Sequence, residues 1–188
     1  MKALPTIWLL TDERLGDGLW DAVRRLPRGA GIILRHHATA PPVRRALALR
    51  LRRIARSRGL TLVTAGLRGF DGLHWHRGAP RHAAALITAS AHSARELRSA
   101  QRAGADIVFL SPAFPTASHP GAQALGPVRF GLMRGFGGVV LALGGVDGRK
   151  AAQLRADGFG AISAWSGPRP PARSGLASRA FRPARKAV

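Results

Sequence analysis

The sequence predicts an α/β fold, and within that class a (β/α)8 TIM barrel built from eight parallel strands. Short apolar segments with the length of buried strands alternate along the chain with segments whose apolar residues recur at helical spacing. Several strand-like segments run straight into polar or glycine-rich turns, as at Arg35 and Gly144-Gly145. Such turns are typical of the carboxyl ends of parallel strands, where ligands bind. With 188 residues the chain is shorter than the ~250 residues usual for this barrel, so the barrel is expected to be short or incomplete.

The predicted strands are runs of four or five mainly apolar residues bounded by glycine, proline or polar residues. They cover residues 7–11, 31–35, 60–63, 72–75, 85–89, 106–110, 139–143 and 161–165. Only a short glycine-containing link separates the third strand from the fourth, so we expect no full helix there.

Four amphipathic helices are predicted between the strands. They cover residues 19–26, 43–58, 93–103 and 148–156. The first helix is expected to stop near Pro27, and Gly59 is a plausible stop for the second. Ser93 and Glu96 form an S-x-x-E capping box at the start of the third.

Composition divides the chain into a barrel domain of residues 1–166 and a basic tail of residues 167–188. The tail is rich in proline, glycine and arginine, carries six basic residues and has no acidic residue. We expect it to be disordered. Residues 175–181 are the only candidate for a helix that closes the barrel.

Charge restricts the class of partner. The chain has 30 Lys and Arg residues against nine Asp and Glu, and its formal net charge of +21 favours anionic partners. Aromatic residues are few and do not alternate with basic ones, which argues against nucleic acid as the binding partner. No apolar run reaches the ~20 residues of a membrane helix, and there is neither a leader-like segment nor a cysteine. We expect a cytoplasmic protein that acts on small phosphorylated molecules; the sequence is silent on its oligomeric state.

An ordered set of motifs resembles one known family. The longest motif comprises Ser90-Ala91-His92-Ser93, Glu96, Ala100 and the run from Gly104 to Thr116. The others are Leu9-Leu10-Thr11-Asp12, Ile33-Leu34-Arg35-His36-His37, Asp71-Gly72-Leu73-His74, Leu141-Ala142-Leu143-Gly144-Gly145-Val146 and Gly160-Ala161-Ile162-Ser163-Ala164. In this order they resemble thiamine phosphate synthase and the related thiazole tautomerase over residues 7–166. The resemblance implies a role in thiamine biosynthesis: joining hydroxymethylpyrimidine diphosphate to thiazole phosphate with release of diphosphate.

The resemblance also implies which residues form the site. Arg35, Ser90, Thr116 and Ser118 correspond to groups that hold the leaving diphosphate, while His37 and His119 stand where the family has lysine. Gly144, Gly145 and Ser163 correspond to the thiazole phosphate site. We assign Arg35, His37 and Ser90 to catalysis and the other six residues to substrate binding. A planar guanidinium can bind two phosphate oxygens at once, and glycine permits close backbone approach. The alternative for each glycine or hydroxyl is a turn or a helix cap.

The family's magnesium site is the main departure. Mg²⁺ is expected from the resemblance, but its aspartate ligands are absent, because the chain has Val63-Thr64-Ala65-Gly66 and Trp75-His76-Arg77-Gly78 in their places. We therefore assign no metal ligand. Arg68 and Arg77 are candidates to replace the lost positive charge. His74 and His76 share one face of a strand but lack a third ligand.

Several functions therefore stay open. The first is a synthase, with activity reduced by the missing aspartates, and the second is a non-catalytic protein that binds a phosphorylated thiamine intermediate. A tautomerase-like isomerase is the third, although Pro112 stands where that enzyme has its catalytic histidine. An electrostatic binder that uses the arginine-rich surface is the fourth.

Overall fold

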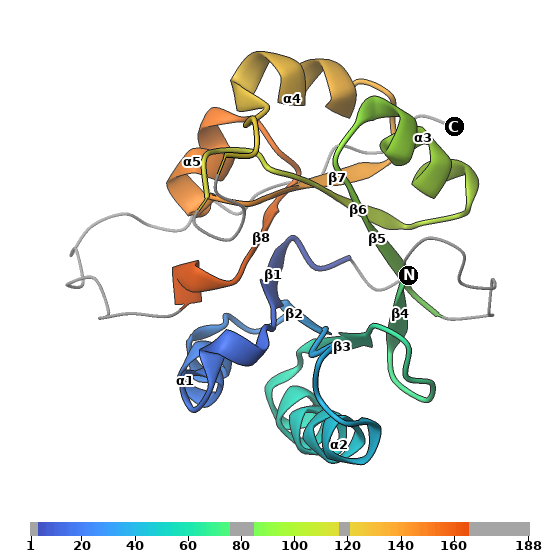
Figure 1. Ribbon diagram of the computed structural model, residues 1–188, viewed down its shortest axis with the longest axis vertical. Helices are drawn as coiled ribbons and strands as arrows, with labels where there is room; N and C mark the ends of the chain where they lie inside the picture. Colours follow the sequence, from blue (N-terminus) through green and yellow to red (C-terminus); the bar gives the residue numbers. More distant parts are fainter. Residues whose placement is uncertain (1–3, 76–84, 117–120, 166–188) are drawn as a thin grey trace.

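The alternating buried segments form eight parallel strands that close into one barrel (Figure 1). The computed structural model describes residues 4–75, 85–116 and 121–165. Each strand pairs with the next in the chain, and the last pairs with the first, so the predicted TIM barrel is confirmed. The strands are β1 Ile7–Leu10, β2 Gly31–Leu34, β3 Thr61–Thr64, β4 Gly72–Trp75, β5 Ile87–Ala91, β6 Ile107–Leu110, β7 Val139–Leu143 and β8 Phe159–Ala161.

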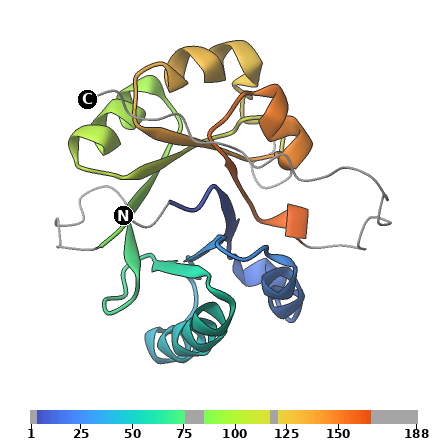
Figure 2. The ribbon, with the colours of Figure 1, turned by 180° about the vertical axis from the view of Figure 1, so that it is seen from behind.

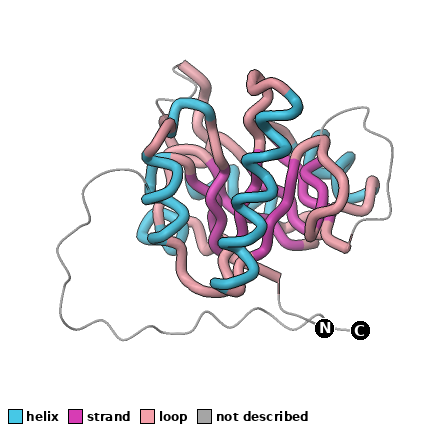
Figure 3. The backbone as a smooth tube through the Cα atoms, turned by 90° about the horizontal axis from the view of Figure 1, so that it is seen from below, coloured by secondary structure: helices cyan, strands magenta, loops and turns pink. Residues whose placement is uncertain are grey.

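Helices surround this barrel (Figures 2 and 3). The described residues form α1 Gly18–Arg25, α2 Pro41–Arg58, α3 Ala94–Arg102, α4 Gly126–Arg134 and α5 Gly148–Gln153, with short 3₁₀ helices η1 Glu13–Leu15 and η2 Ser163–Trp165. In Figure 1, α1 and α2 lie on one side of the barrel, and α3, α4 and α5 lie on the opposite side. None of the helices in the described ranges has the length and apolar character needed to cross a membrane.

The core consists of three apolar clusters. Two of them join strand residues to residues of the surrounding helices. The third contains no helix residue and fills the inside of the barrel; its buried members are Trp8, Leu10, Ile33, Val63, Leu86, Ile107, Phe109 and Leu141. Trp8 and Phe109 meet edge to face, with ring centroids 5.7 Å apart, and both side chains are completely buried.

Two strand glycines make room for these rings. A Cβ atom at Gly31 would lie 2.2 Å from the indole ring of Trp8. At Gly160 it would lie 2.6 Å from Leu10 Cδ1 and 2.9 Å from Phe109 Cε1. The barrel is therefore narrow at these levels, and only glycine fits beside the large side chains.

Most elements predicted from the sequence form close to their expected bounds, but the predicted position of the eighth strand was wrong. It was expected at residues 161–165, whereas β8 is Phe159–Ala161. The backbone N–H of Phe159 donates to Thr6 O at 2.8 Å, which brings β8 into register with β1. Beyond Ala161 the chain turns into η2, and the Trp165 ring stacks on Phe159 with centroids 6.0 Å apart. The apolar run continues past the strand because Trp165 packs back onto it.

Other elements also differ from the prediction. The fifth strand begins at Ile87 rather than residue 85 and extends to Ala91, so Ser90 lies within it. The last described α-helix, α5, ends at Gln153 instead of residue 156. Helix α4 was not predicted, because Phe130 is its one buried residue and it presents no apolar stripe. As expected, residues 65–71 contain no helix. The tail and the candidate closing helix at 175–181 lie outside the described residues.

The packing around Trp8 predicts how a methyl group added at Gly31 changes the stability of the protein. Gly31→Ala should lower the free energy of unfolding by about 3 kcal/mol, because the ring cannot move without disturbing the interior. Gly131→Ala is the matched control, since Gly131 is exposed within α4 and an added Cβ meets nothing within 4 Å. It should raise the stability by about 1 kcal/mol. Urea denaturation followed by circular dichroism measures both; equal effects would contradict the proposed packing constraint.

Candidate functional site

Two adjacent cavities open at the carboxyl ends of the strands. The β6–β8 cavity has a volume of about 400 Å³ and is lined by residues that follow β6, β7 and β8. The β2–β5 cavity has a volume of about 560 Å³ and is lined by residues at the ends of β2 to β5 and on α3. Both are lined by Arg35, His92, Ser111 and Leu143, so these residues form their common border.

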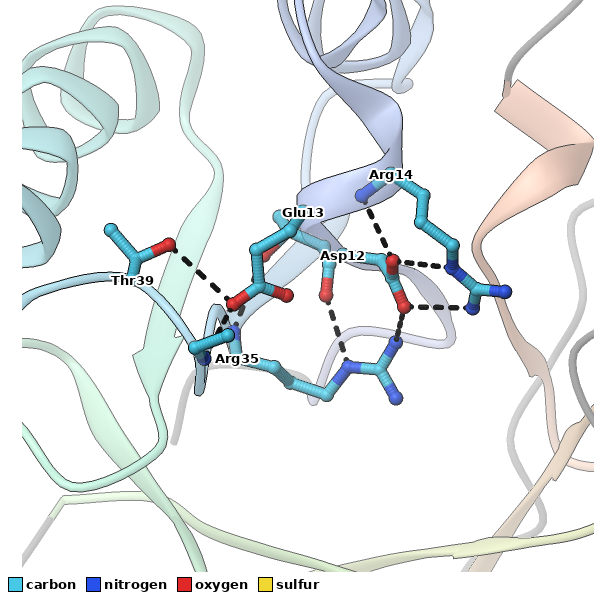
Figure 4. A network of polar contacts seen from close by, with 7 residues as sticks. Asp12, Glu13, Arg14, Arg35 and Thr39 are labelled. Carbon is cyan, nitrogen blue, oxygen red and sulfur yellow. Dashed lines mark hydrogen bonds and ion pairs between the residues drawn. The ribbon is translucent and has the colours of Figure 1, made fainter.

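Arg35 reaches this border from the end of β2. Its backbone N–H donates to Thr11 Oγ1 at 3.2 Å, and its Nε donates to Thr11 O at 3.0 Å. Its Nη2 lies 3.4 Å from Asp12 Oδ2 (Figure 4). These contacts fix the guanidinium along its Nε and Nη2 edge, and none of them involves Nη1. Burial lowers the pKa of Arg35 while Asp12 raises it, and an arginine remains charged at neutral pH.

Asp12 is itself held by a second arginine. Arg14 donates to Asp12 Oδ1 from its backbone N at 3.0 Å and from Nε at 2.7 Å, and Arg14 Nη2 donates to Oδ2 at 2.9 Å (Figure 4). The side-chain hydrogen bond from Arg14 is the largest influence and lowers the pKa of Asp12 to about 2. The carboxylate is therefore ionised at neutral pH and fixes one edge of Arg35.

Glu13 fastens the neighbouring loop. Its Oε1 accepts from the backbone N–H of Ala38 at 2.8 Å and lies 3.5 Å from Thr39 Oγ1 (Figure 4). Desolvation acts to raise the pKa of Glu13, but backbone N–H groups outweigh it, and the pKa lies below its ordinary value. This contact ties η1 to the β2–α2 loop, which carries His37 into the β2–β5 cavity.

A chain of hydroxyl groups and one imidazole lies across β4 and β5. His74 is buried, with Nδ1 2.8 Å from Thr88 Oγ1 and Nε2 3.3 Å from Ser90 Oγ. The two hydroxyls orient the ring, and the ring in turn orients the hydroxyl of Ser90, which lines the β2–β5 cavity. His74 was not among the site residues assigned from the sequence, although it was considered as a metal ligand with His76, which lies outside the described residues. The D-G-L-H motif was the signal that could have placed it in the site.

His92 is a second residue that the site assignment missed. Glu96 Oε2 accepts from the His92 backbone N–H at 2.8 Å and lies 3.2 Å from His92 Nδ1. Ser93 Oγ accepts from the backbone N–H of Glu96 at 3.2 Å, so Ser93 caps α3 as predicted. The cap positions His92 on the border of the two cavities.

The loop after β6 packs on the glycine pair after β7. The backbone N–H groups of Ala113 and Phe114 donate to Leu143 O and Gly144 O at 2.8 and 3.1 Å. Gly144 and Gly145 have φ angles of 84° and 60°, and a Cβ at Gly145 would lie 2.3 Å from Pro115 O. Glycine is required here for both conformation and space. The loop thereby brings Thr116 to the wall of the β6–β8 cavity.

The structure brings most of the assigned residues together. Arg35, His37 and Ser90 line the β2–β5 cavity, and Thr116, Gly144 and Gly145 line the β6–β8 cavity. Ser163 begins η2, between the lining residues Ile162 and Ala164. Ser118 and His119 lie outside the described residues. Lys150 also lines the β6–β8 cavity, and its Nζ donates to Gly145 O at 2.9 Å.

The side chains present do not fit Mg²⁺. In residues 4–75, 85–116 and 121–165, no three His, Cys, Asp or Glu side chains gather as metal ligands. Ala65, at the place of one family aspartate, lines the β2–β5 cavity with no oxygen on its side chain. Its carbonyl oxygen accepts a hydrogen bond from Arg44 Nη2. Arg68, which was considered as a replacement for the metal charge, lines neither cavity.

The lowered pKa of Asp12 predicts a pH-dependent contribution to stability. Asp12→Asn should destabilise the protein by about 1–2 kcal/mol at pH 7, since the side chain is mostly buried. The wild-type advantage should be fully present above 3.8, the ordinary Asp value, and disappear as pH falls through about 2. Urea denaturation at several pH values measures it. Asp17→Asn is the control, because Asp17 is exposed and makes no capping hydrogen bond; an equal loss in both variants would refute the prediction.

Comparison with known proteins relates the chain to one family. Residues 76–167, just under half of the chain, match the family model of thiamine monophosphate synthase. No curated protein matches the chain.

Solved structures show the same barrel. A thiamine phosphate pyrophosphorylase from Pyrococcus furiosus superposes with a TM-score of 0.70 at 23% identity, covering 86% of each chain. A cube-shaped porous protein cage designed by fusing symmetric oligomeric domains has a TM-score of 0.53 at 16% identity, covering 87% of this chain and 64% of that one. A native KDPGal structure has a TM-score of 0.51 at 16% identity, covering 85% and 83%.

The matched residues include the motif from Ser90 to Thr116, on which the sequence resemblance was strongest, and the glycine pair Gly144-Gly145. The structural neighbours support the fold of the whole barrel. The comparisons thus confirm the resemblance to the thiamine phosphate synthase family: residues 76–167 are similar to its family model, and the barrel has the fold of a thiamine phosphate pyrophosphorylase.

Proposed function

We propose that the chain is a transferase of thiamine biosynthesis that joins hydroxymethylpyrimidine diphosphate to thiazole phosphate and releases diphosphate. The observation that carries this proposal is the position of Arg35 on the common border of two cavities. A reaction that joins two molecules is accelerated when both are held with their reacting atoms close together, and two cavities with a common border suit that requirement. The similarity of residues 76–167 to thiamine monophosphate synthase supports this choice of the two molecules.

The two cavities differ in ways that suit the two substrates. The diphosphate would lie at the border, within reach of Arg35, Ser90 and Thr116, with the pyrimidine in the β2–β5 cavity. The thiazole phosphate would lie in the β6–β8 cavity, where Gly145 allows close backbone approach and Lys150 supplies a positive charge. Phosphate sites at the ends of the last two strands recur in this fold.

The chemistry follows from this arrangement. The bond between the pyrimidine methylene carbon and the diphosphate oxygen breaks, and its electron pair leaves with the diphosphate. The methylene carbon becomes electron-deficient, and the lone pair of the thiazole nitrogen attacks it to form the new C–N bond. Arg35 stabilises the negative charge that grows on the diphosphate, because Thr11 and Asp12 hold its guanidinium in place before the reaction.

A non-catalytic binding protein is the second candidate. The specific observation in its favour is the donor set of the β2–β5 cavity, where Ala65 replaces a family aspartate. Such a protein would bind thiazole phosphate or diphosphate compounds without joining them.

An assay with both substrates decides between the candidates. Incubation of the full chain with hydroxymethylpyrimidine diphosphate and thiazole phosphate should yield thiamine phosphate and an equal amount of diphosphate, measured by chromatography. Absence of product from a folded protein, together with calorimetric binding of thiazole phosphate, would instead establish the binding protein.

The contact between the two loops predicts a glycine requirement. Gly145→Ala should lower kcat/KM by about 100-fold, because the new Cβ would displace the loop that carries Thr116. Gly148→Ala is the matched control: it lies three residues further on, at the start of α5, and its nearest contact would be an ordinary 3.8 Å to Phe159 Cε1. Steady-state kinetics of both variants test this; similar values would remove Gly145 from the proposed site.

A further inference from the structure

The carboxylates near the two cavities are already used in hydrogen bonds. Among the described residues, Glu96 is the carboxylate that lines the β2–β5 cavity, and it bonds His92. Asp147 lines the β6–β8 cavity and caps α5 by accepting from the backbone N–H groups of Arg149 and Lys150 at 2.9 and 3.0 Å. A magnesium ion prefers several oxygen ligands in octahedral arrangement. The two carboxylates lie on different cavities, so they do not form such a set.

Asp12 and Glu13, the two carboxylates beside the cavities, are also engaged in hydrogen bonds and so are not available to bind a metal ion. Asp12 bonds both Arg14 and Arg35, and Glu13 bonds the backbone of Ala38. Removal of Asp12 from these contacts to bind a metal ion would release the guanidinium of Arg35 that it positions. The acidic groups at this end of the barrel therefore hold cationic side chains and backbone N–H groups in place.

Basic side chains instead surround the cavities. Arg35 lines both, Lys150 lines the β6–β8 cavity, and the imidazoles of His37 and His92 lie in the wall of the β2–β5 cavity. Arg44, on the first turn of α2, donates from Nη2 to the carbonyl oxygen of Ala65. A positive charge thus lies one hydrogen bond behind the cavity wall, at the residue that replaces a family aspartate. A divalent cation there would be repelled, while an anion would be attracted.

We infer that this end of the barrel binds diphosphate through its own arginine, lysine, imidazole and hydroxyl groups, without a divalent cation. The inference rests on the proposed function and deepens it. Arg35 is the principal ligand, because a planar, permanently charged guanidinium binds two phosphate oxygens at once and its other edge is already fixed by Thr11 and Asp12. Arg44 contributes at longer range through its charge.

Calorimetric titration of the full chain with inorganic pyrophosphate tests the inference. At physiological salt, we expect about one pyrophosphate per chain in buffer containing EDTA, with an affinity that millimolar Mg²⁺ does not raise. Arg35→Gln should weaken binding by at least about tenfold, the effect of losing a charge-assisted hydrogen bond. Arg53→Gln is the matched control, because it removes the same charge from an exposed position on α2, about two and a half turns beyond Arg44.

A second pair of variants tests the inference independently if Arg35→Gln does not fold. Arg44→Gln should weaken pyrophosphate binding less than Arg35→Gln does, and it should leave the binding independent of Mg²⁺. The double variant Arg44→Gln, Ala65→Asp adds a carboxylate and removes the repelling charge, so Mg²⁺ should strengthen pyrophosphate binding to this variant alone.

Each contrary result has a distinct meaning. Binding that requires Mg²⁺, no binding in either buffer, or equal affinities for Arg35→Gln and Arg53→Gln would overturn the inference. Several pyrophosphate ions per chain, unaffected by Arg35→Gln, would overturn it as well, by indicating attraction to the arginine-rich surface. Failure of the proposed synthase function has a different signature: pyrophosphate binds without metal, but no thiamine phosphate forms.

Discussion

The width of the barrel interior is the constraint on which the rest of the structure depends. Trp8 and Phe109 fill the inside, and Gly31 and Gly160 give up their side chains to make room for the aromatic rings and Leu10. Because Gly31 lies on β2 and Gly160 on β8, the strands on both sides of β1 approach closely enough to pair with it. Closure of the barrel then determines where every strand ends and hence which side chains meet at the carboxyl end.

The candidate site is built at the carboxyl end of this barrel from short-range hydrogen-bonded contacts. A carboxylate between two arginines fixes Arg35, a helix cap fixes His92, and two hydroxyl groups fix His74. In each case a polar side chain on a neighbouring element holds the side chain that faces a cavity. These side chains therefore lose little further conformational freedom when a ligand binds. Preorganisation of this kind lowers the cost of binding and of charge stabilisation.

The sequence pattern predicted local features better than features that depend on closure of the barrel. Buried strands are short apolar runs, and Arg35 could be placed because it directly follows one. Strand β8 was misplaced because Gly160 has low strand propensity and is chosen for its fit inside the barrel. The pairing of Asp12 with Arg35, 23 residues apart, and of His74 with Ser90, 16 residues apart, depends on register between neighbouring strands. No spacing rule within a single helix or strand reveals such pairs.

The hydrogen bonds from Ala113 and Phe114 to Leu143 and Gly144 have a consequence for how this protein can diverge. The loop after β6 and the turn after β7 share one surface, with Gly145 against Pro115 O. A change of shape in either segment requires a compensating change in the other, although some 30 positions of sequence separate them. The two segments should therefore co-vary among relatives as one inherited unit, and a chimaera that exchanges only one of them should lose the β6–β8 cavity while the barrel itself survives.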